Sequence, residues 1–215
     1  INRYTTLVLN PILFFFLESR FNSVYTKVSN MDTFRKAKQQ LGKPFFEVDN
    51  CLIYNGDCLE KMLLLNDNSV DLTVTSPPYN IGKEYEEVLP INEYIEWCSN
   101  WMKEIYRITN TSGSFWLNLG YLENPGKAKA LPIAYLLWDK TDFYLIQEIV
   151  WNYGAGVAAK KFFSPRNEKL LWFVKNKNHY TFNLDDIRDK NVKYPNSSKY
   201  YYISSNINTF SVCSI

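Results

Sequence analysis

The sequence has few of the residues that build metal centres. It contains one histidine, His179, and its cysteines show no C-x-x-C spacing; they are Cys51, Cys58, Cys98 and Cys213. A structural zinc site needs about four such ligands close together. The sequence therefore predicts no metal site, and the cysteines are read as reduced thiols of a cytoplasmic protein.

Long apolar runs are also lacking. The run Leu7 to Leu17 is broken by Asn10 and Pro11, and it is shorter than the ~20 residues that a membrane-spanning helix requires. The residues after it do not form the small-residue cleavage site of a signal peptide. We therefore predict neither a membrane partner nor secretion.

A strong overall charge is absent too, since 24 basic and 22 acidic residues leave +2. The distribution is uneven, because residues 154–199 hold ten Lys or Arg against four Asp or Glu. The later part of the chain is therefore expected to carry a basic surface. What the chain has in quantity is apolar residues, 46% of the total, which suits a globular domain with its own core.

Strand and helix patterns alternate through the middle of the chain. Apolar residues recur at three- and four-residue spacing from Ile91 to Ile108, which predicts a helix. Strands are expected over 51–55, 70–74, 114–119, 144–153 and 170–175, and further helices over 58–65 and 132–138. This alternation predicts an α/β sheet with helices packed on it. Because ligands bind beyond the carboxyl ends of strands in such sheets, the loops after Tyr54 and Thr75 are expected at the functional edge.

The most informative segment is D-L-T-V-T-S-P-P-Y-N, which ends in Ser76, Pro77, Pro78, Tyr79 and Asn80. Two prolines at a strand end restrict the backbone and remove two amide donors, so mostly acceptors point outward. An exocyclic amino group on a base is a poor nucleophile, and acceptors that hold its hydrogens can direct its lone pair. The Ser76 hydroxyl and the Pro77 carbonyl are candidates, and Tyr79 offers a flat face for an extruded base. The alternative is a rigid turn with a core tyrosine.

This segment resembles the catalytic motif of amino-group DNA methyltransferases, the branch that places S-P-P-Y before the target-recognition segment. Y-N-G-D-C-L-E-K-M upstream is similar to the strand and Gly-Asp turn that precede the motif. Downstream, G-S-F-W-L-N-L-G, E-I-V-W-N-Y-G and S-P-R-N-E-K-L-L-W-F-V-K-N are similar to the later strands, in the expected order. The resemblance covers about residues 52–193.

The resemblance implies an incomplete Rossmann-like methyltransferase sheet with helices on both faces. It implies transfer of a methyl from S-adenosylmethionine to the amino group of a flipped base in double-stranded DNA, as in restriction-modification systems. Serine before P-P-Y favours N4 of cytosine. The alternatives are N6 of adenine, an RNA or protein-amide substrate, and a catalytically inactive DNA-binding remnant.

The resemblance also points to residues outside the motif. Asp57 matches an acidic position that helps to hold the cofactor, although an aspartate there also suits a helix N-cap. Basic residues of the later part match the region that approaches DNA, and a solvated basic face is the ordinary explanation. These candidate phosphate contacts are Lys160, Lys161, Arg166 and Lys169. Arg166 and Glu168 match a family pattern to which the sequence assigns no chemical role.

The chain departs from the family in one respect. The glycine-rich cofactor loop of this branch, F-x-G-x-G, lies near the carboxyl end, whereas the last glycine here is Gly156. We therefore expect an incomplete cofactor pocket, a chain inactive alone, and a complementing carboxyl-terminal chain as a partner. The expected parts are residues 1–30 as a non-native or disordered extension before Met31, 31–195 as a partial methyltransferase catalytic domain, and 196–215 as an aberrant or disordered tail.

Overall fold

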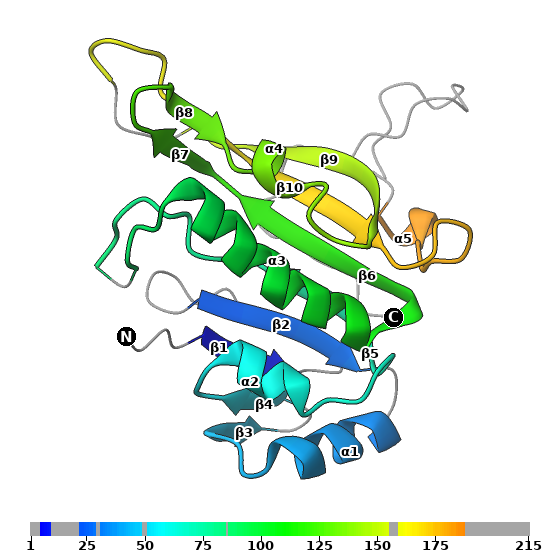
Figure 1. The fold of residues 1–215 in the computed structure, drawn as a ribbon. Helices are drawn as coiled ribbons and strands as arrows, with labels where there is room; N and C mark the ends of the chain where they lie inside the picture. The colour runs from blue at the N-terminus through cyan, green and yellow to red at the C-terminus, as the bar shows by residue number, and fades with distance from the viewer. Residues whose placement is uncertain are drawn as a thin grey trace, which may run out of the picture.

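The computed structural model describes residues 5–9, 22–28, 31–48, 51–84, 86–154 and 159–187 (Figure 1). Within them lie a mixed sheet of order β3-β4-β1-β2-β5-β6-β10-β9 and a separate hairpin β7-β8. The strands are β1 (Thr5–Leu9), β2 (Asn22–Val28), β3 (Phe46–Val48), β4 (Cys51–Tyr54), β5 (Val70–Thr75), β6 (Thr109–Leu119), β7 (Tyr121–Asn124), β8 (Ala128–Pro132), β9 (Tyr144–Asn152) and β10 (Asn167–Val174). The helices are α1 (Met31–Leu41), α2 (Cys58–Leu63), α3 (Ile91–Ile108), α4 (Ala134–Leu137) and α5 (Leu184–Ile187).

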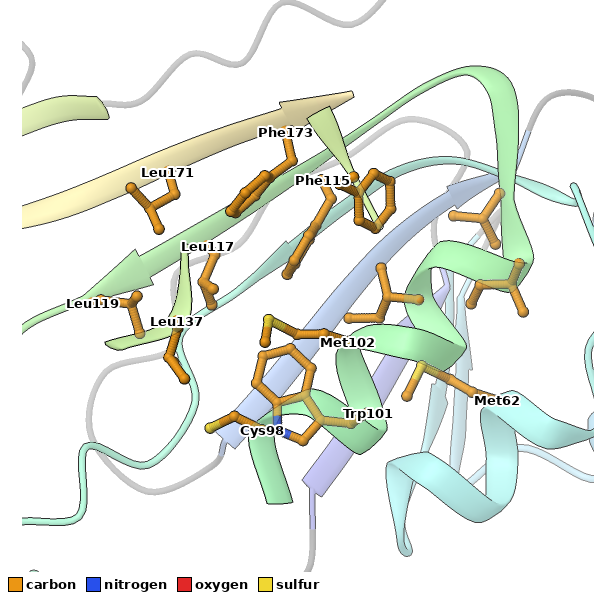
Figure 2. Close-up of a cluster of buried hydrophobic side chains, with 14 of the residues drawn as sticks. Met62, Cys98, Trp101, Met102, Phe115, Leu117, Leu119, Leu137, Leu171 and Phe173 are labelled. Carbon is orange, nitrogen blue, oxygen red and sulfur yellow. The ribbon is translucent and has the colours of Figure 1, made fainter. Parts of the chain in front are cut away.

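Helix α3 connects the parallel strands β5 and β6 and supplies much of the core. Its buried residues recur every three or four positions, so they form one stripe that faces the sheet. They are Tyr94, Cys98, Trp101, Met102, Ile105 and Ile108. Figure 2 shows Trp101 and Met102 directed toward Phe115 and Leu117 of β6. This packing holds β5 and β6 side by side, and both strands end at the candidate site.

The side chains of strand β6 point alternately to the core and to the opposite face of the sheet. Phe115, Leu117 and Leu119 are buried in the core beside α3, whereas Trp116 and Asn118 point to the other face. On that face Trp116 stacks on its cross-strand partner Trp172 of β10, with ring centroids 5.3 Å apart and an interplanar angle of 17°. The other face of β6 therefore presents Asn118 toward the candidate site.

Two strands, β1 and β2, come from the first 30 residues, which the sequence predicts to be a non-native or disordered extension. β1 and β2 lie side by side between β4 and β5, with β2 antiparallel to β5. Their sequences, TTLVL and NSVYTKV, contain the β-branched residues that favour strands. The expectation that Met31 is the natural start stays a prediction. The expected tail, residues 196–215, lies outside the described residues.

Strand directions bring three carboxyl ends to one edge. β6 is parallel to β5, β2 is antiparallel to β5, β1 is parallel to β2, and β4 is antiparallel to β1. It follows that β4, β5 and β6 point the same way. β10 is antiparallel to β6, so its first residues lie at this same edge. The edge expected from the sequence to carry function therefore gathers the loops after Tyr54, Thr75 and Leu119.

The predicted α/β class is confirmed, with a mixed sheet. Helices α2 and α4 both contact α3, so these three helices form one layer on the sheet. The second helical layer that the resemblance implies stays a prediction. Among the described helices, none combines the length and the apolar character needed to cross a membrane.

Candidate catalytic site

The S-P-P-Y segment leaves the end of β5 as a supported turn. Ser76 is exposed, whereas Pro77 behind it is buried. The hydroxyl of Tyr94, on the buried face of α3, donates a hydrogen bond to the Pro78 carbonyl at 2.7 Å. The turn is thus attached to the core helix, and Ser76 is held at the surface of the sheet edge.

Asn80 continues the turn in the left-handed region, with φ of 60°. Its side chain accepts from the Leu89 amide at 2.7 Å and donates to the Leu89 carbonyl at 2.8 Å. The Glu86 carboxylate accepts from the amides of Asn80 and Ile81, at 2.8 and 3.0 Å. Asparagine tolerates this conformation better than most residues. Asn80 and Glu86 therefore close the loop that follows the motif.

Tyr79 lies at the centre of a hydrogen-bonded group drawn from three strand ends. Its hydroxyl is 2.8 Å from Ser76 Oγ and 3.0 Å from a carboxylate oxygen of Glu168, at the start of β10. The Asn118 amide, near the end of β6, donates to the Tyr79 hydroxyl at 3.0 Å and to Glu168 at 2.5 Å. The four side chains therefore form one connected cluster.

The direction of the protons in this cluster follows from its acceptors. A carboxylate only accepts, so the Tyr79 hydroxyl donates its single proton to Glu168. Burial, followed by the Glu168 carboxylate, raises the pKa of Tyr79 far above its usual range, so this proton stays in place at neutral pH. The Ser76 hydroxyl must then donate to the Tyr79 oxygen. Ser76 Oγ is left with its lone pairs directed outward as an acceptor.

Gly120 determines how closely Tyr79 approaches β6. A Cβ atom at this glycine would lie 2.7 and 2.8 Å from two ring carbons of Tyr79. Side chains at such distances clash, so the ring occupies space that only glycine leaves open. The position of Tyr79 thus depends on a residue outside its own motif.

Asn118 carries an unmet hydrogen-bonding group. Its Oδ1 atom is buried and has no hydrogen-bond partner among the described residues. Leaving a buried acceptor unpaired costs about 1–3 kcal/mol. Thr73 Oγ1, Trp101 Nε1 and Thr141 Oγ1 are buried without a partner in the described residues as well, so an unpaired group does not by itself indicate a site. The Asn118 oxygen differs from these in its location, because the amide of the same side chain binds Tyr79 and Glu168.

Asp57 lies at the same edge but acts locally as a helix cap. Its Oδ1 atom accepts from the amides of Leu59 and Glu60, at 2.7 and 3.3 Å, at the start of α2. Strands β1 and β2 separate the end of β4, which precedes Asp57, from β5, which precedes Ser76. The capping interpretation is confirmed, and the cofactor role of Asp57 stays a prediction.

The four basic candidates fall into two groups. Lys160, Lys161 and Arg166 are exposed in the connection between β9 and β10. Lys169 instead pairs with Glu148 across β9 and β10, at 3.4 Å, and its side chain is largely covered. The first three form a basic loop at the site edge, whereas Lys169 has an acidic partner.

Sequence reasoning missed Asn118 and Gly120 and assigned no role to Glu168. The sequence does show that Gly120 directly follows a predicted strand, and that Glu168 ends the segment S-P-R-N-E. What connects them to Tyr79 is the antiparallel pairing of β10 with β6, which joins positions about 50 residues apart. No local pattern reveals that pairing.

Comparison with known proteins identifies the family of the chain. The family model N6_N4_Mtase, described as DNA methylase, matches residues 70–210. The chain therefore belongs to this family of DNA methylases.

Two curated relatives and one solved structure illustrate the likeness. The chain is 59% identical to the type II methyltransferase M.ScaI of Streptomyces caespitosus over 162 residues, 75% of this chain and 53% of that protein. It is 38% identical to the type II methyltransferase M.BglII of Bacillus subtilis over 150 residues, 69% of this chain and 41% of that protein. The PvuII DNA methyltransferase (cytosine-N4-specific) structure matches with a TM-score of 0.51 and 20% identity, over 62% of this chain and 52% of that one. The fold is thus shared with a solved methyltransferase, and the chain spans about half or less of these curated relatives.

Proposed function

We propose that this chain carries the base-binding side of the catalytic centre of a site-specific DNA methyltransferase. The reaction would move a methyl group from S-adenosylmethionine to the exocyclic amino group of a base extruded from double-stranded DNA. The observation that carries the proposal is the hydrogen-bond chain from Ser76 through Tyr79 to Glu168. Membership of the DNA methylase family supports it.

The chain of hydrogen bonds supplies what a weak amine nucleophile needs. Ser76 Oγ would accept a hydrogen from the amino nitrogen, and the Pro77 carbonyl would accept the second. As the nitrogen gains the methyl it becomes positive, and the negative charge of Glu168 stabilises that charge through Tyr79 and Ser76. The extra proton would leave the nitrogen for Ser76 Oγ, while the Ser76 proton passes to the Tyr79 oxygen and the Tyr79 proton passes to the Glu168 carboxylate, which becomes neutral. The bond to the methyl forms as the bond from sulfur to the methyl breaks, so no covalent enzyme intermediate is needed.

S-adenosylmethionine would supply an electrophilic methyl on a sulfonium. In this chain Asp57 fits it as an exposed carboxylate at the site edge whose two amide contacts both use Oδ1. Its Oδ2 atom would accept from a ribose hydroxyl or an amine of the cofactor. Lys160, Lys161 and Arg166 would contact phosphates, in a manner weakened by salt. The proposal includes action in the cytoplasm, which is supported by the free thiols of Cys51, Cys58 and Cys98.

We propose N4 of cytosine as the acceptor, because serine precedes P-P-Y. The test mixes the purified chain with the carboxyl-terminal half of a relative such as M.ScaI and supplies labelled cofactor and mixed-sequence DNA. Digestion to nucleosides identifies the product. N4-methylcytosine is expected, whereas N6-methyladenine alone contradicts the base choice. The chain without the added half is expected to be inactive.

Variants separate catalysis from DNA affinity in the same assay. Ser76→Ala removes the acceptor, and Glu168→Gln removes the charge while keeping the shape, so turnover should fall on the order of 100-fold for each. The KM for DNA should change little. Unchanged turnover in both folded variants contradicts the proposed centre. DNA binding without turnover in the complemented enzyme supports the inactive remnant instead.

A further inference from the structure

Residues 159–166, here called the tip loop, carry two aromatic side chains in water. Phe163 is 99% exposed and Phe162 is 44% exposed. Lys160 and Lys161, also exposed, come directly before them. Neither phenylalanine belongs to the core or to the cluster around Tyr79. Single exposed apolar side chains are normal on a protein surface, so the distinguishing feature of this loop is the combination of two adjacent aromatic residues with two adjacent cations.

The exposure of Phe163 is imposed by the loop. The Ala159 amide donates to Ser164 Oγ at 3.2 Å, which closes the turn that contains both phenylalanines. At the base of the loop, the Tyr153 amide donates to the Arg166 carbonyl at 3.0 Å. The Arg166 guanidinium donates to the Gly154 carbonyl at 3.0 Å. These bonds hold the tip in a preformed shape, so Phe163 is presented before any partner arrives.

The tip loop stands beside the candidate catalytic centre. Two residues after Arg166, the chain reaches Glu168, which accepts from Tyr79. Figure 1 shows the tip loop, in yellow, extending past the edge of the sheet near the hairpin of β7 and β8. A duplex whose base enters the site at Ser76 and Tyr79 therefore meets the tip loop on the same side of the molecule.

We propose that Phe163 inserts into the base stack of the duplex beside the extruded nucleotide, while Lys160 and Lys161 contact the flanking phosphates. This inference rests on the proposed function. Extruding a base leaves a gap in the stack, and an aromatic ring fills such a gap on either neighbouring base face. The adjacent lysines complement a polyanion rather than an apolar protein surface.

The test measures binding of the 215-residue chain to a mixed-sequence duplex and to the same duplex with one central abasic site. The abasic site provides the gap in advance, so the chain should bind that duplex roughly tenfold more tightly. Phe163→Ala should remove this preference, and Phe163→Trp should keep it. Phe163→Ala should leave the slope of log affinity against log salt unchanged. Lys160→Ala with Lys161→Ala should weaken both duplexes alike and lower that slope by about two.

Phe45→Ala is the matched control, because Phe45 is 76% exposed and lies beside β3 at the opposite end of the sheet. It should leave both affinities unchanged. Equal binding of both duplexes by the wild-type chain and by Phe163→Ala overturns the inference. So does a change in self-association, measured by sedimentation, as the sole effect of Phe163→Ala. This test measures only DNA binding, whereas the proposed chemistry is tested by methyl transfer in the complemented enzyme. A failure of the Phe163 contact is therefore distinguished from a failure of the proposed chemistry.

Discussion

The two parts of Tyr79 have separate tasks in the proposed site. Its ring offers a face to an extruded base, and its hydroxyl connects Ser76 to Glu168. Tyr79→Ala should lose on the order of 1–3 kcal/mol of base interaction. Tyr79→Phe keeps the ring, so KM for DNA should stay near the wild-type value while kcat falls. Steady-state kinetics of the complemented enzyme measure both constants, and an equal rise of KM in the two variants contradicts this division.

Gly120 provides a test at the residue scale that needs no activity. Gly120→Ala places a methyl group against the Tyr79 ring, at distances that require the ring to move. We expect a loss of about 1–3 kcal/mol in the free energy of unfolding, measured with urea. Tyr79→Ala removes the opposing ring, so the double variant should lose less than the sum of the two single losses. Additive losses show that the ring and the glycine do not meet.

At the scale of elements, Lys175 stabilises the end of helix α3. Its ammonium group donates to the carbonyls of Tyr106 and Thr109, at 2.8 and 2.7 Å, and to Asn68 Oδ1 at 2.8 Å. A cation at a helix carboxyl end satisfies unpaired carbonyls and interacts favourably with the dipole. Lys175→Met should therefore cost about 1–2 kcal/mol in urea unfolding.

The matched control for this prediction is Lys177→Met, two residues further along. Lys177 is exposed, and its ammonium lies 5.9 Å from the centre of the Tyr144 ring. Its replacement should change the free energy of unfolding by less than about 0.5 kcal/mol. If the two methionine variants are equally stable, the contacts of Lys175 contribute no net stability.

Elements with a strong periodic pattern were predictable from the sequence. Helix α3 has the bounds expected from its apolar spacing, because one stripe of the helix meets the core. Strand β6 begins at Thr109, five residues before the expected start, because its first residues, T-N-T-S-G, are polar and lack the apolar alternation from which a strand is predicted. The hairpin of β7 and β8, whose turn spans residues 125–127, was not anticipated, since its two strands are short and lack a clear apolar alternation. Partners distant in sequence, such as Glu168 for Tyr79, require the tertiary pairing.

At the scale of the whole molecule, alkaline pH should weaken the fold through the buried thiol of Cys98. Burial raises the pKa of Cys98 from 9.0 to about 12. The unfolded chain releases this proton near pH 9, whereas the folded chain keeps it until about pH 12. The stability from this group is therefore complete below pH 9 and is lost as the pH rises through that window.

We expect the free energy of unfolding to fall by roughly 1 kcal/mol through Cys98 between pH 8 and pH 10. Urea unfolding at the two pH values measures the fall, and Cys98→Ala should make it smaller. Some fall should remain in that variant, because burial also raises the pKa of the neighbouring Tyr94. An equal fall in the wild-type chain and in Cys98→Ala shows that the thiol is not the source.

The stacked indoles of Trp116 and Trp172 provide an intrinsic spectroscopic probe of the fold. Two indoles with centroids 5.3 Å apart couple their electronic transitions, and where the transition dipoles of the two rings are skewed the coupling appears as a paired positive and negative band in the circular dichroism spectrum. The two rings belong to β6 and β10, the strands that carry Asn118 and Glu168. The intensity of that couplet therefore reports, without any label, whether the two strands that complete the catalytic cluster are in register.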